Sequence, residues 1–205
     1  MFTVLVVAGV VAIGGGIAAL ARTLRMPDLS PLRDARRCAI ADAPDATNVR
    51  IEGTVEALGE TLPAPLSRER CVYYEHLVST LGAGQGAEVH RAAHHVPFIV
   101  RDASGYAIVD AAGATVQVTR HERREDGGRP IADTLDPVSG RGRLRHFEAL
   151  IRPGDRVAVI GRGVREPDPD ARHTQASYRD GPATRLRLNH SPQFPLHVID
   201  ADRTI

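Results

Sequence analysis

The sequence predicts a mainly β, antiparallel domain, closed as a barrel or a sandwich, that follows one N-terminal transmembrane helix. Three observations support this prediction. The first 21 of the 205 residues contain no Asp, Glu, Lys or Arg. From Val49 onward, short apolar stretches are separated by Gly, Pro and Asp, and residues 49–58 alternate apolar and polar positions. No run with the spacing of an amphipathic helix lies between them, so sheets must supply the core.

Residues 1–21 form the predicted transmembrane helix. After the initial methionine, the only polar side chain in this segment is that of Thr3. A helix of twenty residues is about 30 Å long, which matches the hydrocarbon thickness of a bilayer. Ala8, Ala12 and Gly16 form a row of small residues, the pattern through which two transmembrane helices associate. The lipid bilayer is therefore the expected partner of this segment. Self-association through the row of small residues is one reading, and the alternative is that small residues are simply common in such spans.

The charges that follow the apolar segment predict its topology. Residues 22–37 contain five arginines and two aspartates. The positive-inside rule places such a segment in the cytoplasm and the short N-terminus outside. A cleaved signal peptide is the alternative, because Ala19-Leu20-Ala21 resembles a cleavage site. The length of the apolar run, and the lack of a basic residue before it, favour an uncleaved single-pass anchor.

A linker and one soluble domain follow the anchor. Residues 22–48 are expected to be a basic juxtamembrane linker, because Pro27, Pro31 and Pro44 interrupt a stretch of charged and small residues. Residues 49–200 are expected to form the β domain. Its location is predicted to be the cytoplasmic side of the membrane.

The β domain is expected to contain seven or eight short strands. Asp102-Ala103-Ser104-Gly105 is a turn sequence that joins two of them as a hairpin. Two polar segments, 120–146 and 166–182, are predicted to be loops. Such a series of strands favours a closed architecture, of which an OB-like barrel is one form. The predicted strands cover residues 49–58, 71–78, 96–100, 106–109, 115–118, 156–160, 184–188 and 196–199.

Composition excludes several classes of site. All 26 basic residues are arginine, so the chain has no lysine for a Schiff base or a P-loop. A formal net charge of +1 argues against nucleic acid as a partner. The two cysteines, Cys38 and Cys71, cannot build a four-thiolate zinc site. We therefore predict no cofactor and no resident metal.

The candidate chemical groups are interpreted as structural. His90, His94 and His95 are the densest histidine group, but they lack a full set of zinc ligands, and we interpret them as a polar loop entering a strand. The glycines within 82–86 lack the lysine of a phosphate loop and are read as a hairpin tip. Cys71 opens an apolar run, where cysteine usually behaves as a small buried apolar residue. No catalytic residue is assigned.

Five motifs follow the apolar span in a fixed order. They are I-E-G-T-V at 51–55, L-P-A-P-L-S at 62–67, C-V-Y-Y at 71–74, P-F-I-V-R-D-A-S-G at 97–105 and E-A-L-I-R-P-G-D-R-V-A-V-I-G at 148–161. This order resembles the GIDE domain, a membrane-associated module of mitochondrial RING-type E3 ubiquitin ligases that has simpler prokaryotic relatives. The motif residues are expected to act in the structure: Gly53, Pro65, Cys71, Tyr73, Tyr74, Pro97, Phe98, Asp102, Gly105, Glu148, Gly154, Asp155 and Gly161.

The resemblance implies a function that the chain can fulfil only in part. A RING holds two zinc ions with about eight Cys and His ligands, and this chain has two cysteines. We therefore predict a single-pass membrane protein whose GIDE-like domain is a non-catalytic interaction or scaffold module for an unknown protein partner. Two alternatives stay open. One is an E3 ubiquitin-transferase activity, as the family implies, and the other is a membrane-bound hydrolase that uses Cys71 or the histidines.

Overall fold

The computed structural model describes residues 35–80, 87–123, 144–169 and 183–201. The predicted transmembrane helix at 1–21, most of the linker and the glycines at 82–86 lie outside these residues. No helix that could cross a bilayer is present in the described ranges.

The described residues form strands and no α-helix. The strands are β1 (Arg36–Arg37), β2 (Thr47–Ala57), β3 (Leu62–Pro63), β4 (Arg70–Cys71), β5 (Tyr73–Thr80), β6 (Glu88–His95), β7 (Phe98–Arg101), β8 (Tyr106–Asp110), β9 (Thr115–Gln117), β10 (Arg120–Arg123), β11 (Leu144–Ile151), β12 (Arg156–Pro167), β13 (Thr184–Asn189) and β14 (His197–Asp200). The prediction of a mainly β fold is confirmed.

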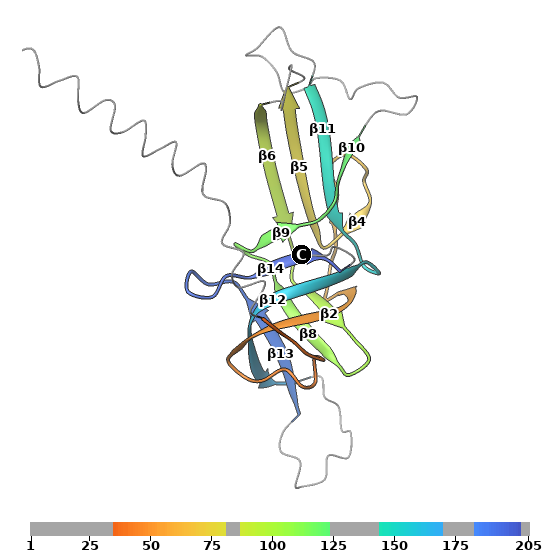
Figure 1. Cartoon of the computed structure of the whole chain (residues 1–205). Helices are drawn as coiled ribbons and strands as arrows, with labels where there is room; N and C mark the ends of the chain where they lie inside the picture. The colour runs from red at the N-terminus through yellow and green to blue at the C-terminus, as the bar shows by residue number, and fades with distance from the viewer. Residues whose placement is uncertain (1–34, 81–86, 124–143, 170–182, 202–205) are drawn as a thin grey trace, which may run out of the picture.

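Five strands close into a barrel (Figure 1). They are hydrogen bonded in the order β2, β7, β8, β13 and β12, and β12 returns to pair with β2. The predicted hairpin is present, because β7 and β8 pair antiparallel around the turn at 102–105. The expected antiparallel pairing holds for most strands of the described residues, but β8 pairs with β13 and β9 pairs with β14 in parallel. The long connections between these partners allow the chain to cross over and return in the same direction.

Alternation along β2 builds one side of the barrel core. Val49, Ile51 and Val55 point inward and are almost fully buried. Phe98 at the start of β7 is also fully buried among them. Strand β12 is buried on both faces over Val157–Gly161. Val157 and Val159 belong to the barrel core, whereas Ala158 and Ile160 form a second, small cluster with Ile199 of the neighbouring strand β14, against which Ala35 packs.

A second sheet of four strands stands out from the barrel (Figure 1). Its order is β10, β11, β5 and β6, and every pairing is antiparallel. The sequence predicted only β5 of these strands. The loop predicted around His90–His95 is wrong, because these residues belong to β6 and pair with β5 along its length. The predicted loop at 120–146 is wrong at both ends, where β10 and β11 pair with each other.

Polar strands form here because their charges are matched across the sheet. Arg120 in β10 forms an ion pair with Glu75 in β5, with 2.6 Å between Nε and Oε1. Arg145 in β11 forms one with Glu122 in β10, also at 2.6 Å. Such cross-strand pairs stabilise the pairing of strands whose residues are mostly polar.

The ends of two other predicted segments also need correction. The linker predicted for 22–48 ends earlier, since β1 pairs with β2 and the side chains of Ile40 and Ala43 are buried in the core. The loop predicted for 166–182 begins later, because β12 continues to Pro167. In both places the chain gains backbone hydrogen bonds with a neighbouring barrel strand.

Candidate functional site

A hollow of about 660 Å³ lies where the second sheet meets the barrel. We call its charge-paired lining residues Glu69, Arg123, Arg152 and Asp155 the first wall, and the remaining polar residues Thr119, His121, Arg156 and Asp200 the second wall. Leu150 is the only apolar side chain among the described residues that line it. A polar hollow of this size is within the range of small-molecule sites.

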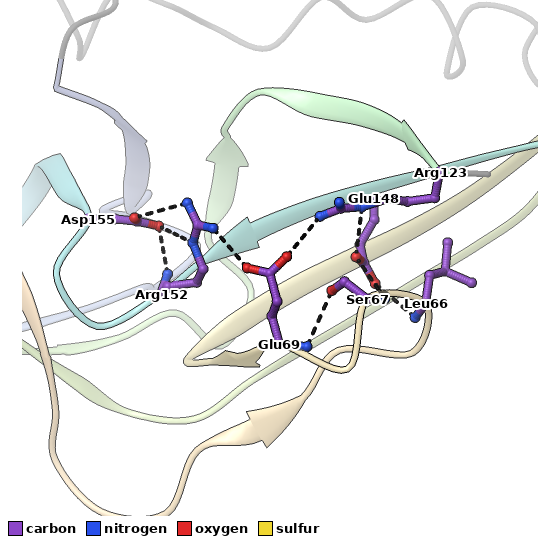
Figure 2. A network of polar contacts seen from close by, with 7 residues as sticks. All are labelled: Leu66, Ser67, Glu69, Arg123, Glu148, Arg152 and Asp155. Atoms are coloured by element: carbon purple, nitrogen blue, oxygen red, sulfur yellow. Dashed lines mark hydrogen bonds and ion pairs between the residues drawn. The ribbon is translucent and has the colours of Figure 1, made fainter. Parts of the chain in front are cut away.

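Glu148 is the buried anchor behind the first wall. Its carboxylate is fully buried and accepts hydrogen bonds from the backbone N–H groups of Leu66 (2.9 Å) and Ser67 (3.3 Å) (Figure 2). The Nε atom of Arg123 lies 3.1 Å from its second oxygen. A buried carboxylate keeps its charge only with such partners. Glu148 therefore ties β11 to β10 and to the loop between β3 and β4.

The same chain of charges continues along the wall of the hollow (Figure 2). Glu69 accepts from Arg123 Nη2 at 3.4 Å and from Arg152 Nη1 at 2.8 Å. The Arg152 hydrogen bond is the main reason why the pKa of Glu69 is below its usual value. Arg152 also reaches Asp155, with Nη2 3.4 Å from Oδ1. Cations and anions thus alternate and neutralise one another on this wall.

The turn at 152–155 brings this wall to the barrel rim. Gly154 has a φ of 96°, a conformation that favours glycine. Asp155 accepts a hydrogen bond from the backbone N–H of Arg152 at 2.8 Å, and its own backbone carbonyl accepts from Val55 N–H at 2.9 Å. The turn residues therefore join β11, β12 and β2, which is a structural role.

The second wall leaves hydrogen-bond donors unused. Asp200 Oδ2 accepts from Thr119, through its backbone N–H (2.9 Å) and its hydroxyl (2.8 Å). Arg156 and His121 are exposed, and neither side chain has a hydrogen bond or an ion pair to any residue in the described ranges. These two side chains are free to bind a ligand.

Five histidines share one face of the second sheet, a grouping that the sequence analysis missed. The strand registers place His76, His90, His94, His121 and His146 on the same side. Their positions are far apart along the chain, so only the strand pairing brings them together. Among the described residues no group of three His, Cys, Asp or Glu side chains is arranged to hold a metal ion.

The centre of this histidine face is a stacked pair. His76 Nε2 lies 3.2 Å from His146 Nδ1, and the ring centroids are 5.4 Å apart. His90 meets His76 edge-on at 5.9 Å. Burial, followed by the neighbouring His146 and His90, lowers the pKa of His76. His95 points to the opposite face, where its Nε2 is 3.7 Å from Asp110, so the three histidines that are dense in sequence do not converge.

Cys71 does not have the properties of a nucleophile. Its side chain is fully buried, and its thiol donates to the backbone carbonyl of Leu62 at 3.4 Å. Burial, with the nearby Glu148 and Glu69, raises its pKa to about 11. A thiol of this kind is protonated at neutral pH, whereas the thiolate is the reactive form. This argues against a hydrolase that uses Cys71.

Asp102 closes the hairpin turn. Its carboxylate accepts from the backbone N–H groups of Ser104 (2.7 Å), Gly105 (3.0 Å) and Ile40 (2.9 Å). Burial alone would raise the pKa of Asp102, but these bonds and the Ser104 hydroxyl together hold it below its usual value. The residue fixes the turn and ties the segment before β2 to the barrel.

The other motif residues lie apart from the hollow. Tyr73 is buried, and burial and the adjacent Glu75 raise its pKa to about 12. Tyr74 faces the other side and lies against the His94 ring, with centroids 5.1 Å apart. Pro65 lies between β3 and β4, and Pro97 lies between β6 and β7.

Two motif glycines lie where a side chain would collide. A Cβ at Gly53 would overlap the backbone carbonyl oxygen of Arg101 in the adjacent strand β7. At Gly161 a Cβ would come within 2.7 Å of the Leu196 side chain, which is a more adaptable neighbour. Gly53 therefore sets the spacing of β2 and β7 in the barrel.

Comparisons of the chain with protein-family models, with curated proteins and with solved structures gave no significant match. The residues themselves must therefore carry the functional assignment.

Proposed function

We propose that the chain is a membrane-anchored, non-catalytic interaction module related to the GIDE domain. The apolar segment 1–21 would anchor it, and the β domain would lie in the cytoplasm. The order of the five motifs and the arginines that follow the apolar segment support this proposal. In this proposal, the five-stranded barrel is an OB-like scaffold that supports the second sheet.

The observation that carries the proposal is the exposed edge of the second sheet. Strand β6 is the outer strand, and six of its eight residues are exposed. Only β5 pairs with β6 among the described residues, so its other backbone edge is unpaired. An edge of this kind accepts an extended segment as an additional strand. The partner that fits is a protein with an extended segment that pairs along β6.

The centre of β6 is suited to such an addition. Ala92 and Ala93 are small, so they leave room on both faces for the side chains of an incoming strand. Arg91, one residue before them, is fixed by Glu88 (2.7 Å) and Glu75 (3.7 Å). The strand therefore offers a backbone edge with little steric obstruction at its centre.

Site-specific photo-crosslinking in the full chain, in its native membranes, tests this proposal. A benzophenone residue at Ala92 should give one adduct that maps to one partner segment. The same probe at Ala57, an exposed alanine at the end of β2, should not give that adduct. A synthetic peptide with the mapped sequence should compete the adduct away. Equal adducts at both positions, or none at Ala92, would contradict the proposal.

A further inference from the structure

The unused groups of the hollow point to the chemistry of a ligand. On the first wall, the arginines already donate to Glu69, Glu148 and Asp155. On the second wall, Arg156 and His121 have no described partner, and Asp200 uses only Oδ2 for Thr119. The hollow therefore offers a ligand the guanidinium of Arg156, the imidazole of His121 and the Oδ1 atom of Asp200.

These groups suit a ligand that has both an anion and hydroxyl groups. A guanidinium binds a phosphate with two parallel hydrogen bonds. A carboxylate oxygen accepts a hydrogen bond from a hydroxyl. The described lining contains three arginines and three carboxylates, so its balanced charge disfavours a polyanion. The volume of about 660 Å³ also exceeds what one inorganic phosphate would fill, and Leu150 alone offers little surface to an apolar ligand.

We propose that the hollow binds a phosphorylated polyol, whose phosphate is held by Arg156 and His121 and whose hydroxyl donates to Asp200. Glycerol phosphate is the smallest ligand of this class. It occurs both as a free metabolite and as the headgroup of phosphatidylglycerol. The site depends neither on the membrane anchor nor on a protein partner at β6, so it can fail or succeed independently of the proposed function.

Calorimetry on the full chain in neutral detergent micelles tests the site. Glycerol 3-phosphate should bind at one site, inorganic phosphate should bind more weakly, and glycerol should give no heat. The Arg156→Gln variant should weaken glycerol 3-phosphate binding by about tenfold or more. Arg156 is exposed, so the variant should fold. Arg36→Gln is the matched control, because Arg36 is an exposed arginine in β1, away from the hollow, and should bind as the unchanged chain does.

His121 and the source of the ligand are tested separately. His121→Gln should also weaken binding, and Asp200→Asn should reduce the preference for glycerol 3-phosphate over inorganic phosphate. In phosphatidylcholine nanodiscs, added phosphatidylglycerol should raise the apparent Kd for glycerol 3-phosphate if the lipid headgroup occupies the hollow. An unchanged Kd identifies a soluble ligand. The proposal is overturned if glycerol 3-phosphate does not bind, or if Arg156→Gln binds it as tightly as Arg36→Gln does.

Discussion

Glu148 shows how the environment decides the role of a single carboxylate. In the sequence it is one acid in a motif of mixed character. In the fold it is fully buried, accepts two backbone N–H groups and faces Arg123. Its lone pairs are used by these partners, so it holds the loop between β3 and β4 against the second sheet.

A conservative change at this position should be costly. Glu148→Gln keeps the shape but removes the charge that balances Arg123, and its amide presents donors to the N–H groups of Leu66 and Ser67. We expect the free energy of unfolding to fall by about 3 kcal/mol, the typical cost of breaking a buried charge pair. Urea unfolding followed by circular dichroism measures this change.

The matched control is Glu56→Gln. Glu56 forms an ion pair with Arg101 at 2.6 Å on the barrel surface, and both side chains are more than two-fifths exposed. An exposed pair of this kind contributes less than about 1 kcal/mol. If Glu148→Gln cost no more than Glu56→Gln, the buried network would not be the structural link that the fold implies.

At the scale of the element, the second sheet shows what pattern reasoning can and cannot find. Strand β2 alternates apolar and polar residues because one face enters the core, whereas β7 and β8 are short apolar runs on either side of a turn sequence. Both patterns are visible in the sequence. Strands β6 and β10 expose polar residues on both faces and have no such period. Ion pairs with partners remote in sequence support them: Arg120–Glu75 and Arg145–Glu122 for β10, and Arg91–Glu75 for β6. Alternating charge at 120–123 is the signal that could have indicated β10.

The histidine face should make the second sheet sensitive to acid. The pKa of His76 is lowered in the folded chain by burial and by His146 and His90, while Glu148 acts in the opposite direction. The unfolded chain therefore takes up the His76 proton first as the pH falls below about 6.5. Proton uptake by the unfolded chain lowers the free energy of unfolding. This loss begins near the unfolded pKa and is complete once the pH has fallen below the folded pKa of His76.

Replacement of His76 tests this linkage. The free energy of unfolding of the unchanged chain should fall between pH 7.5 and 5, and that of His76→Gln should fall less. Above pH 7.5 the two curves should run parallel, which provides an internal control. A steeper acid loss in His76→Gln would show that the pKa of His76 is raised by folding instead. Titration of the His76 ring by NMR measures the same pKa directly.

At the scale of the whole molecule, the sequence predicted the barrel better than it predicted the hollow. The barrel strands can be predicted because their apolar patterns and the turns between them are encoded by residues that are adjacent in the sequence. The first wall of the hollow combines Glu69, Arg123 and Arg152 from three separate parts of the chain, and the second adds Asp200. Nothing local distinguishes these residues from other surface charges. Only the tertiary contacts of Glu69 with Arg123 and Arg152, and of Asp200 with Thr119, bring them together.

The proposed membrane anchor at residues 1–21 is tested by fractionation of the full chain. We expect the full chain to stay in the membrane pellet after alkaline washing, because residues 1–21 carry no charge. A charge near the centre of this segment opposes insertion by about 3 kcal/mol. Val11→Arg should therefore move part of the chain to the soluble fraction, and Val11→Leu should not.

Topology follows from the same experiment. A reporter that is active only in the cytoplasm, fused after Ile205, should be active, because the arginines within 22–37 are expected to keep this side of the proposed anchor in the cytoplasm. The same reporter at the N-terminus should be inactive. If a signal peptide is cleaved instead, the mature chain would begin after Ala21 and would appear outside the cytoplasm without the anchor. N-terminal sequencing distinguishes the two outcomes. If the chain is cleaved and exported, the partners of the β6 edge and of the hollow must be sought outside the cytoplasm.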